Sequence, residues 1–206
     1  MAVTVTQLQA LYVAYFGRPA DAGGIAFWQA RSESEGLDAS AVGEALYESA
    51  EARARYPDEA PEALVDRVYA NILGRSPDTT GRAFWIEELE SGRLDAARLP
   101  LTVFNAVRGG DADHLDNRIA AADVFTDQAV ATDYIGQPAA AVARDWLDGI
   151  DADASSLTLA SNSLAGLFTR ISDGAVTGHA LDGYISGADV YVDTNGNGVA
   201  EASEQQ

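Results

Sequence analysis

Two stretches of the chain are closely alike: YVAYFGRPADAGGIAFW at residues 12–28 and YANILGRSPDTTGRAFW at residues 69–85. They align without a gap at an offset of 57 residues, and eight of their positions are identical. Self-similarity at a fixed offset is the sequence signature of a repeated structural unit. The chain therefore carries an internal repeat, and the structure of that unit decides the fold.

Each copy of the repeat predicts a helix, a turn and a second helix. Apolar side chains before the turn recur with the spacing of one helix face. Gly17 and Gly74 stand where a helix ends in the left-handed conformation that glycine favours. Asp21 and Asp78 stand where a carboxylate can cap the next helix. The sequence TVTQ at residues 4–7 resembles a capping box for the first helix.

The repeated Gly-Arg-x-x-Asp turn has two interpretations. It could be a binding site, or its Arg could be held against the turn carboxylate and the helix carbonyls, which would fix the angle between the helices. Duplication favours the structural role, because catalytic sites are seldom repeated within one small domain. The recurring Phe-Trp pairs that follow each turn are likewise expected in the core rather than around a cofactor.

Further helices are expected after the first copy and beyond the second. Apolar residues at helical spacing predict them over residues 40–55, 96–107, 114–125, 139–150 and 155–172. The loops between them are short, which favours antiparallel neighbours. The segment 108–113 is the expected joint within the helical part.

The character of the chain changes after Gly174. Frequent glycines break any helix there, and residues 184–192 have β propensity with partial alternation. One or two strands cannot form a stable sheet alone. We therefore expect this segment to pack on the helices, to pair with another chain, or to begin a domain of a longer parent protein.

These patterns together predict the fold class and the domain organisation. The fold is expected to be mainly α, an array of about eight to ten short antiparallel helices with an internal repeat, followed by a short β segment. Residues 1–110 form a duplicated helix-turn-helix module, with repeats near 5–56 and 62–107. Residues 111–174 continue the helical array, and residues 175–206 hold the strand and a calcium loop.

A calcium loop is predicted because residues 193–204 fit all the fixed positions of the pattern D-x-[DN]-x-[DN]-G-x5-E. Oxygen atoms without His or Cys suit calcium rather than zinc or copper. An Asn-Gly hairpin turn is the alternative, but it does not require the final glutamate. The expected metal ligands are the side chains or carbonyls of Asp193, Asn195, Asn197, Val199, Glu201 and Glu204.

Composition excludes several classes of function. The 206 residues hold 32 Asp and Glu against 13 basic residues, all of them Arg, so the net charge is −19. Such a chain lacks the basic clusters that bind nucleic acid. Without Cys it has neither disulfides nor thiolate chemistry. No stretch is long and apolar enough to span a bilayer.

Enzyme signatures are missing from the sequence. The motifs of serine hydrolases, zinc proteases, P-loop proteins and dinucleotide-binding enzymes do not occur. His114 and His179 are far apart and have no partner at ligand spacing, so each is interpreted as a helix-surface or loop histidine. We therefore expect no catalytic residues and no enzymatic activity.

The repeated Tyr-x-x-x-(Leu/Phe)-Gly-Arg-x-x-Asp-x-x-Gly-x-x-Phe-Trp resembles domain-of-unknown-function family 4214. Residues 46–56 look like that family's closing helix, residues 115–126 look like the segment that commonly follows, and the likeness covers roughly residues 5–172. The resemblance implies a helical module of a bacterial secreted protein of the repeats-in-toxin, S-layer or adhesin kind. The family has no agreed activity.

Both ends of the sequence add weaker resemblances. Residues 1–8 resemble the N-termini of S-layer proteins exported by type I secretion, in which the helical domain anchors the layer to lipopolysaccharide. Residues 183–204 resemble the opening of calcium-binding β-sandwich modules of surface adhesins. These resemblances imply an extracellular or cell-surface location and export without a Sec-type signal peptide.

Three functions remain open from the sequence. The first is a non-enzymatic extracellular module that anchors or assembles a secreted surface layer or adhesin, with calcium ordering the C-terminal loop. The second is a self-polymerising filament subunit that uses the C-terminal strand. The third is a carbohydrate-binding or carbohydrate-active protein. The expected partners are a second copy or a longer parent chain, and lipopolysaccharide or a surface polysaccharide.

Overall fold

The computed structural model describes residues 2–57, 60–129, 134 and 136–172, with 136, 137 and 172 described through their backbone only. In this part of the chain the fold is built of ten α-helices and one short 3-10 turn. The elements are α1 Val5–Phe16, α2 Ala22–Glu35, α3 Ala39–Tyr47, α4 Ala50–Arg55, α5 Pro61–Leu73, α6 Thr79–Glu90, η1 Ala96–Arg98, α7 Leu99–Ala106, α8 Gly110–Ala129, α9 Gly136–Leu147 and α10 Ala154–Ser172.

The helix ends of the repeat form as the sequence predicts. The capping box at the start of α1 is complete, since Thr4 and Gln7 exchange side-chain to backbone hydrogen bonds. Gly17 and Gly74 end α1 and α5 with φ of 65° and 59°. The Asp21 carboxylate accepts a hydrogen bond from the backbone N–H three residues on, and its counterpart before α6 does the same. These local signals therefore fix the start and end of each helix pair.

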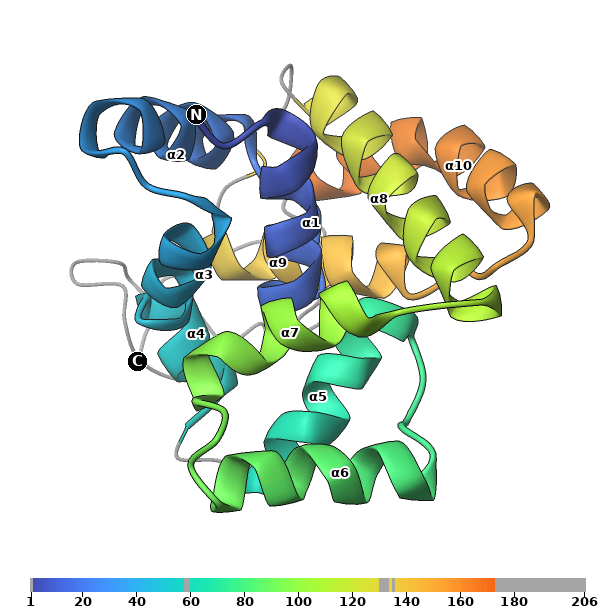
Figure 1. Ribbon diagram of the computed structural model, residues 1–206. Helices are drawn as coiled ribbons and strands as arrows, with labels where there is room; N and C mark the ends of the chain where they lie inside the picture. Colours follow the sequence, from blue (N-terminus) through green and yellow to red (C-terminus); the bar gives the residue numbers. More distant parts are fainter. Residues whose placement is uncertain (1, 58–59, 130–133, 135, 173–206) are drawn as a thin grey trace, which may run out of the picture.

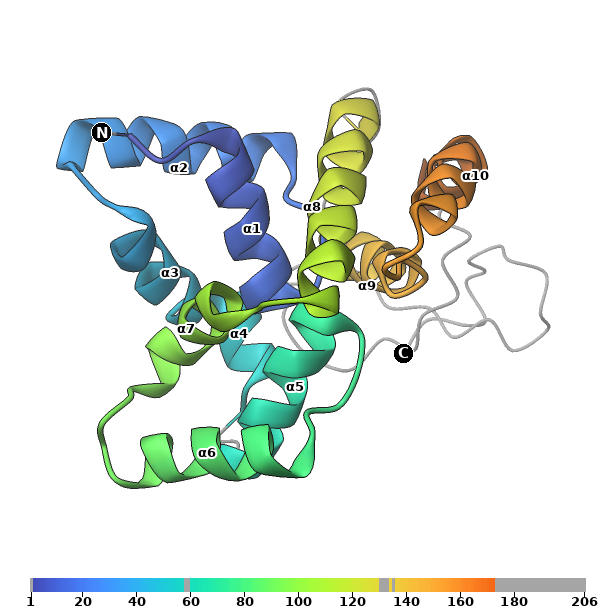
Figure 2. The same cartoon turned by 45° about the vertical axis from the view of Figure 1, so that its right-hand side comes forward.

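The two copies occupy opposite halves of one body. Figure 1 shows α2 at the top and α6 at the bottom, with α1, α3, α7 and α5 between them. Both views show α2 crossing α1 steeply, and α6 crossing α5 in the same way (Figures 1 and 2). The prediction of antiparallel neighbours is therefore wrong for these two helix pairs. The first helix ends at a glycine in the left-handed conformation, and the residue that caps the next helix is extended. The second helix therefore crosses the first at a steep angle instead of running antiparallel to it.

One hydrophobic core joins the two copies. It is built from the inner faces of α1, α3, α5 and α7, and Leu8, Val42, Val65 and Leu99 are all fully buried in it. Because each helix pair is too small to enclose its own apolar face, the copies stabilise each other. The repeat is thus a single folded unit rather than two independent ones.

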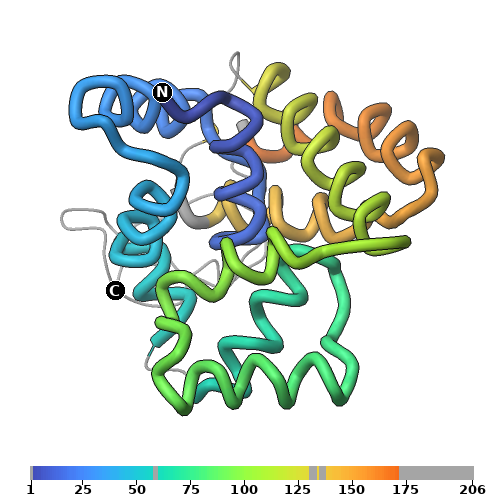
Figure 3. The backbone as a smooth tube through the Cα atoms, in the orientation of Figure 1, coloured from blue at the N-terminus to red at the C-terminus, as the bar shows by residue number. Residues whose placement is uncertain are grey.

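Helices α8, α9 and α10 continue the fold on one side of the repeat. The backbone trace in Figure 3 shows α8 between α1 and α10. The fully buried Gln9 side chain donates to the Ala122 carbonyl at 3.2 Å and to Thr126 Oγ1 at 2.6 Å. Thr126 in turn donates to the Ala20 carbonyl at 2.7 Å. These buried polar contacts hold α8 against the first copy.

The predicted fold class needs a correction beyond the helix angles. The residues that the structure describes contain helices and loops but no strand. The segment predicted as a strand, 184–192, and the rest of 175–206 lie outside them. The expectation of a helical array followed by a β segment is therefore replaced by a helical fold.

One predicted helix and the predicted joint also differ from their expected form. The segment 40–55 forms two helices, because Ser49 caps a new one by accepting from Ala52 N. The joint expected at 108–113 is shorter, and α8 already begins at Gly110. None of the described helices combines the length and apolar character needed to cross a membrane.

Candidate functional site

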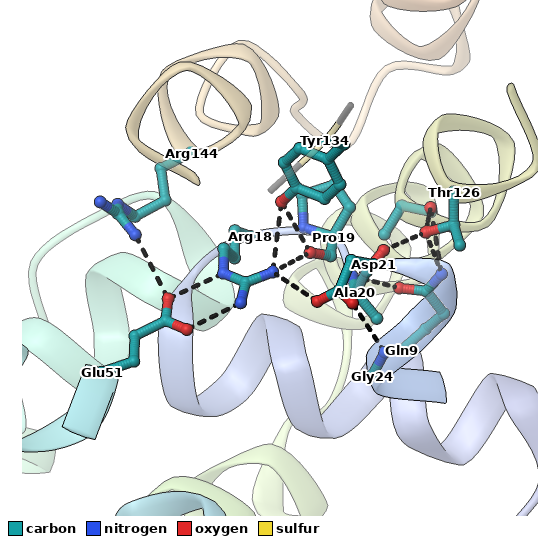
Figure 4. Close-up of polar contacts among 11 residues, drawn as sticks. Gln9, Arg18, Pro19, Ala20, Asp21, Gly24, Glu51, Thr126, Tyr134 and Arg144 are labelled. Carbon is teal, nitrogen blue, oxygen red and sulfur yellow. Dashed lines mark hydrogen bonds and ion pairs between the residues drawn. The ribbon is translucent and has the colours of Figure 1, made fainter. Parts of the chain in front are cut away.

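The strongest cluster of charged side chains surrounds the Arg of the first turn (Figure 4). Arg18 lies buried between the start of α4 and the segment after α8, and its Nε and Nη2 donate to the two carboxylate oxygens of Glu51, both at 2.7 Å. Its Nη1 donates to the Pro19 carbonyl at 2.9 Å and to the Tyr134 hydroxyl at 3.2 Å. Asp21 lies 3.8 Å from Nη1. The guanidinium therefore donates four hydrogen bonds to partners within the chain.

The second copy repeats this arrangement in a more exposed setting. Arg75 donates from Nε and Nη2 to the Asp111 carboxylate at 3.3 and 2.5 Å. Its Nη1 donates to the Ser76 carbonyl at 3.0 Å, as Arg18 does to the carbonyl that follows it. The side chain of Arg75 is 42% exposed, against 9% for Arg18. Both copies thus use one bidentate clamp, which ties each turn to the first turn of a later helix.

Burial and neighbouring charges set the protonation of the cluster. Burial alone would lower the pKa of Arg18, but its hydrogen bonds to Glu51 and Tyr134 and the Glu51 charge hold that pKa above its ordinary value. Arg144 lies 3.6 Å from Glu51, and burial together with Arg55 and Arg18 lowers its pKa. Burial raises the pKa of Tyr134 to about 12. Arg18 and Tyr134 are thus held in their protonated forms, and their hydrogen bonds fix the geometry of the cluster.

The tyrosine at the start of each copy packs against the arginine of the same copy. The guanidinium of Arg18 lies 5.1 Å from the Tyr12 ring centroid, and that of Arg75 lies 5.8 Å from the Tyr69 ring. Trp85 Nε1 donates to the Tyr69 hydroxyl at 3.1 Å. The repeated Tyr and Arg therefore contact each other in both copies, and in the second copy Trp85 joins them.

The glycine of each second helix lies close to that tyrosine. A Cβ atom at Gly24 would lie 2.2 Å from the Tyr12 hydroxyl, and one at Gly81 would lie 3.1 Å from the Tyr69 hydroxyl. At Gly24 only a residue without a side chain lets the hydroxyl approach this closely, whereas at Gly81 a Cβ would be a tight contact that a small shift of Tyr69 could relieve. Packing therefore explains the glycine of the first copy more strongly than that of the second.

Sequence reasoning found the structural role of the arginines but missed their main partners. The turn carboxylate was expected to hold Arg18, yet Asp21 is a secondary contact and Glu51 is the bidentate partner. In the second copy Asp111 takes this place, three residues further along than the repeat offset predicts. The likeness of residues 46–56 to a closing helix was the signal that could have drawn attention to Glu51.

The Phe-Trp pairs divide between core and surface. Trp28 is buried, as predicted, and Trp85 is half-buried against the core. Their neighbours Phe27 and Phe84, which were predicted in the core, are 56% and 50% exposed. That part of the prediction is wrong because adjacent residues on a helix point about 100° apart, so one apolar stripe cannot bury both.

The predicted metal site cannot be compared with the fold. The six expected ligands, Asp193 to Glu204, lie outside the described residues, as does His179. Within the described part of the chain no three His, Cys, Asp or Glu side chains gather in a way that could hold a metal ion. His114 lies on α8, where its Nε2 is buried and finds no hydrogen-bond partner among the described residues.

A hollow of about 440 Å³ lies between the end of α9 and the start of α10. It is lined by Trp146 and by the carboxylates of Asp151 and Asp153, with serines at its edge. The two carboxylates accept hydrogen bonds from the backbone of the loop itself. Asp153 Oδ1 accepts from Ser155 N at 2.9 Å, and Asp151 Oδ1 accepts from Asp153 N at 2.8 Å. The hollow is open and shaped mainly by local turns.

Comparison with known proteins adds one finding. A family model described as a domain of unknown function (DUF4214) matches residues 43–102, which run from α3 through the second copy to α7. This supports the resemblance stated on the repeated motif for that part of the chain. No curated protein and no solved structure matches the chain.

Proposed function

We propose that the chain is a non-enzymatic extracellular module that anchors or assembles a secreted surface layer or adhesin. The observation that carries the proposal is the duplicated clamp, in which Arg18 with Glu51 and Arg75 with Asp111 make the same bidentate pair of hydrogen bonds. The residues of the repeated Gly-Arg-x-x-Asp motif thus have a structural role in the fold. A rigid scaffold of this kind suits a protein that anchors or assembles the subunits of a surface layer or adhesin.

The charge of the chain supports a calcium-dependent form of this role. A net charge of −19 opposes close packing of copies or contact with an anionic envelope unless cations intervene. The loop from Asp193 to Glu204 would hold one such ion, and free calcium in the medium would screen the rest. Lipopolysaccharide or a surface polysaccharide is the proposed anchoring partner.

Cosedimentation with vesicles of purified lipopolysaccharide tests the proposal. The chain is expected to pellet with the vesicles in millimolar calcium and to remain in solution with a chelator. The double variant Asp193→Ala/Glu204→Ala, which leaves every described contact intact, should lose most of this binding. Equal recovery in the supernatant under both conditions would overturn the proposal.

A second candidate function, carbohydrate binding, is favoured by the hollow beside Trp146. An indole ring next to carboxylates and hydroxyls is a combination that can stack on a sugar ring and accept its hydrogen bonds. Titration with oligosaccharides should then quench tryptophan fluorescence in the unmodified chain but not in Trp146→Phe. An unchanged spectrum would exclude this candidate.

A further inference from the structure

Helix α10 differs in charge from the rest of the chain. The 206 residues include 32 acidic ones, so a helix of 19 residues would hold about three on average, yet α10 holds none and its single charge is Arg170. The helix lies at the edge of the described fold, beyond α8 (Figures 1 and 2). A net charge of −19 keeps copies of the chain apart over most of their surface, and α10 is where this repulsion is weakest.

The outer face of α10 is exposed along its whole length. Leu164, Leu167 and Phe168 bury the opposite side of the helix. The outer face, whose residues are spaced by three or four positions, consists of Ser155, Leu159, Asn162, Gly166 and Arg170. Leu159 is the most exposed large apolar residue of the described chain, at 70%, and a Cβ atom at Gly166 would meet no neighbour within 4 Å. The face therefore carries an apolar projection and, two turns further on, a gap.

The two ends of this face carry opposite charges. Asp151 and Asp153 precede the helix and line the hollow beside Trp146, to which Leu159 also contributes, whereas Arg170 lies in the last turn. All three charged residues are exposed, and none forms an ion pair with another residue that the structure describes. The projection and the gap, and likewise the two charged ends, complement each other when a second copy of the face runs in the opposite direction.

We propose that the outer face of α10 is a self-association surface, on which the α10 helices of two copies pack antiparallel about a two-fold axis near Asn162. A register with Leu159 of one copy over Gly166 of the other also sets Arg170 opposite Ser155. Arg170 then lies beside Asp151 and Asp153 of the second copy. Each contact occurs twice, because a two-fold interface uses the same patch on both copies.

The size of the face predicts a weak and reversible dimer. A helix of 19 residues is about 28 Å long and about 11 Å wide, so two such faces would bury roughly 600 Å² in total. Stable interfaces bury about 1,200 Å² or more, so we expect a Kd of roughly 10–100 µM. The proposal goes beyond the anchoring role, and it depends on neither calcium nor lipopolysaccharide.

Sedimentation equilibrium of the full chain, in a chelator and about 0.15 M salt, tests the proposal. The mass is expected to rise from monomer towards dimer between about 10 and 300 µM chain. Leu159→Glu, which adds a charge, and Gly166→Gln, which fills the gap, should each weaken dimerisation at least about tenfold. Phe84→Glu is the matched control, since it changes an exposed apolar residue on α6, and it should dimerise like the unmodified chain.

An exchange of charges tests the pairing at the ends of the face. Arg170→Glu alone and Asp151→Arg alone should both stay monomeric where the unmodified chain dimerises, because like charges would meet. An equal mixture of the two variants should form heterodimers, since each new charge then faces its opposite. Asp153 is left unchanged because its carboxylate caps α10.

Single cysteines test the direction of the two helices, because the chain has no cysteine of its own. Asn162→Cys lies near the two-fold axis and should give a disulfide-linked dimer on mild oxidation. Thr169→Cys lies seven residues further along, so in an antiparallel pair its two copies would be about 20 Å apart and should not link. A parallel pair would link both variants.

Four results would overturn the proposal. The first is a chain that stays monomeric at about 300 µM, the second is a mixture of the charge variants without heterodimers, and the third is equal cross-linking of the two cysteine variants. The fourth is a lower melting temperature for Gly166→Gln, because Gln in an exposed helix should raise it unless another part of the same chain covers the face. None of these measurements uses calcium or lipopolysaccharide, so their failure is distinguishable from a failure of the anchoring role.

Discussion

Replacing Arg18 by Met should destabilise the fold far more than the same change at Arg75. The variant leaves Glu51, whose side chain is only 17% exposed, without its two 2.7 Å hydrogen bonds and with Arg144 at 3.6 Å as its remaining cation. Removing one partner of a buried ion pair costs about 3–5 kcal/mol. Because Glu51 is not fully buried and keeps Arg144, we expect about 3 kcal/mol.

The Arg75→Met variant is the internal control for this prediction. Arg75 and Asp111 are 42% and 39% exposed, so solvent screens their interaction, and its loss should cost about 0.5–1 kcal/mol. Urea unfolding followed by far-ultraviolet circular dichroism measures both values, and the melting temperature of the Arg18 variant should fall by about 6–12 °C.

The comparison of the two variants can refute the reasoning directly. If Arg18→Met and Arg75→Met shift the urea midpoint by the same amount, burial does not set the strength of the clamp. The triple variant Arg18→Met/Glu51→Met/Arg144→Met should recover much of the lost stability, because it removes Glu51 and also Arg144, which the loss of Glu51 would otherwise leave unpaired. A triple variant less stable than Arg18→Met would show that an unpaired Glu51 is not the cause of the loss.

Three further predictions concern packing, pH and metal. Gly24→Ala should cost about 1–3 kcal/mol in urea unfolding, because its Cβ would lie 2.2 Å from the Tyr12 hydroxyl, and Tyr12→Phe in the same chain should restore part of the loss. Burial and a nearby arginine lower the pKa of His114 below 6.5, so the unfolded chain takes up the proton first. Stability should therefore fall as pH drops below about 6.5, and His114→Gln should flatten this dependence in melting curves. Calorimetry should detect about one calcium ion per chain, and Asp193→Ala/Glu204→Ala should abolish that binding.

The parts of the fold that depend on local chemistry could be predicted from the sequence. A left-handed glycine, a capping carboxylate and the 3.6-residue period each act within a few residues, so the helices of the repeat were placed well. The angle between the two helices of each pair could not be predicted, because a short loop allows both antiparallel and crossed neighbours. Ser49 shows a similar limit, since its cap divides a segment whose apolar spacing suggested one helix.

The partners of the clamp required the tertiary structure. Arg18 reaches Glu51 across 33 residues, and Arg75 reaches Asp111 across 36, so no fixed spacing identifies both pairs. The exposed Phe27 and Phe84 were misplaced for a different reason. Identity between the copies suggests a requirement of the core, whereas both side chains are exposed.

The proposed anchoring role is tested most directly on whole cells of the organism that produces the chain. Labelled chain is added in millimolar calcium to cells stripped of their surface layer and to intact cells. We expect saturable binding to the stripped cells, reversal by a chelator, and little binding to cells whose surface layer is intact. Equal or absent binding to the two kinds of cell would contradict it.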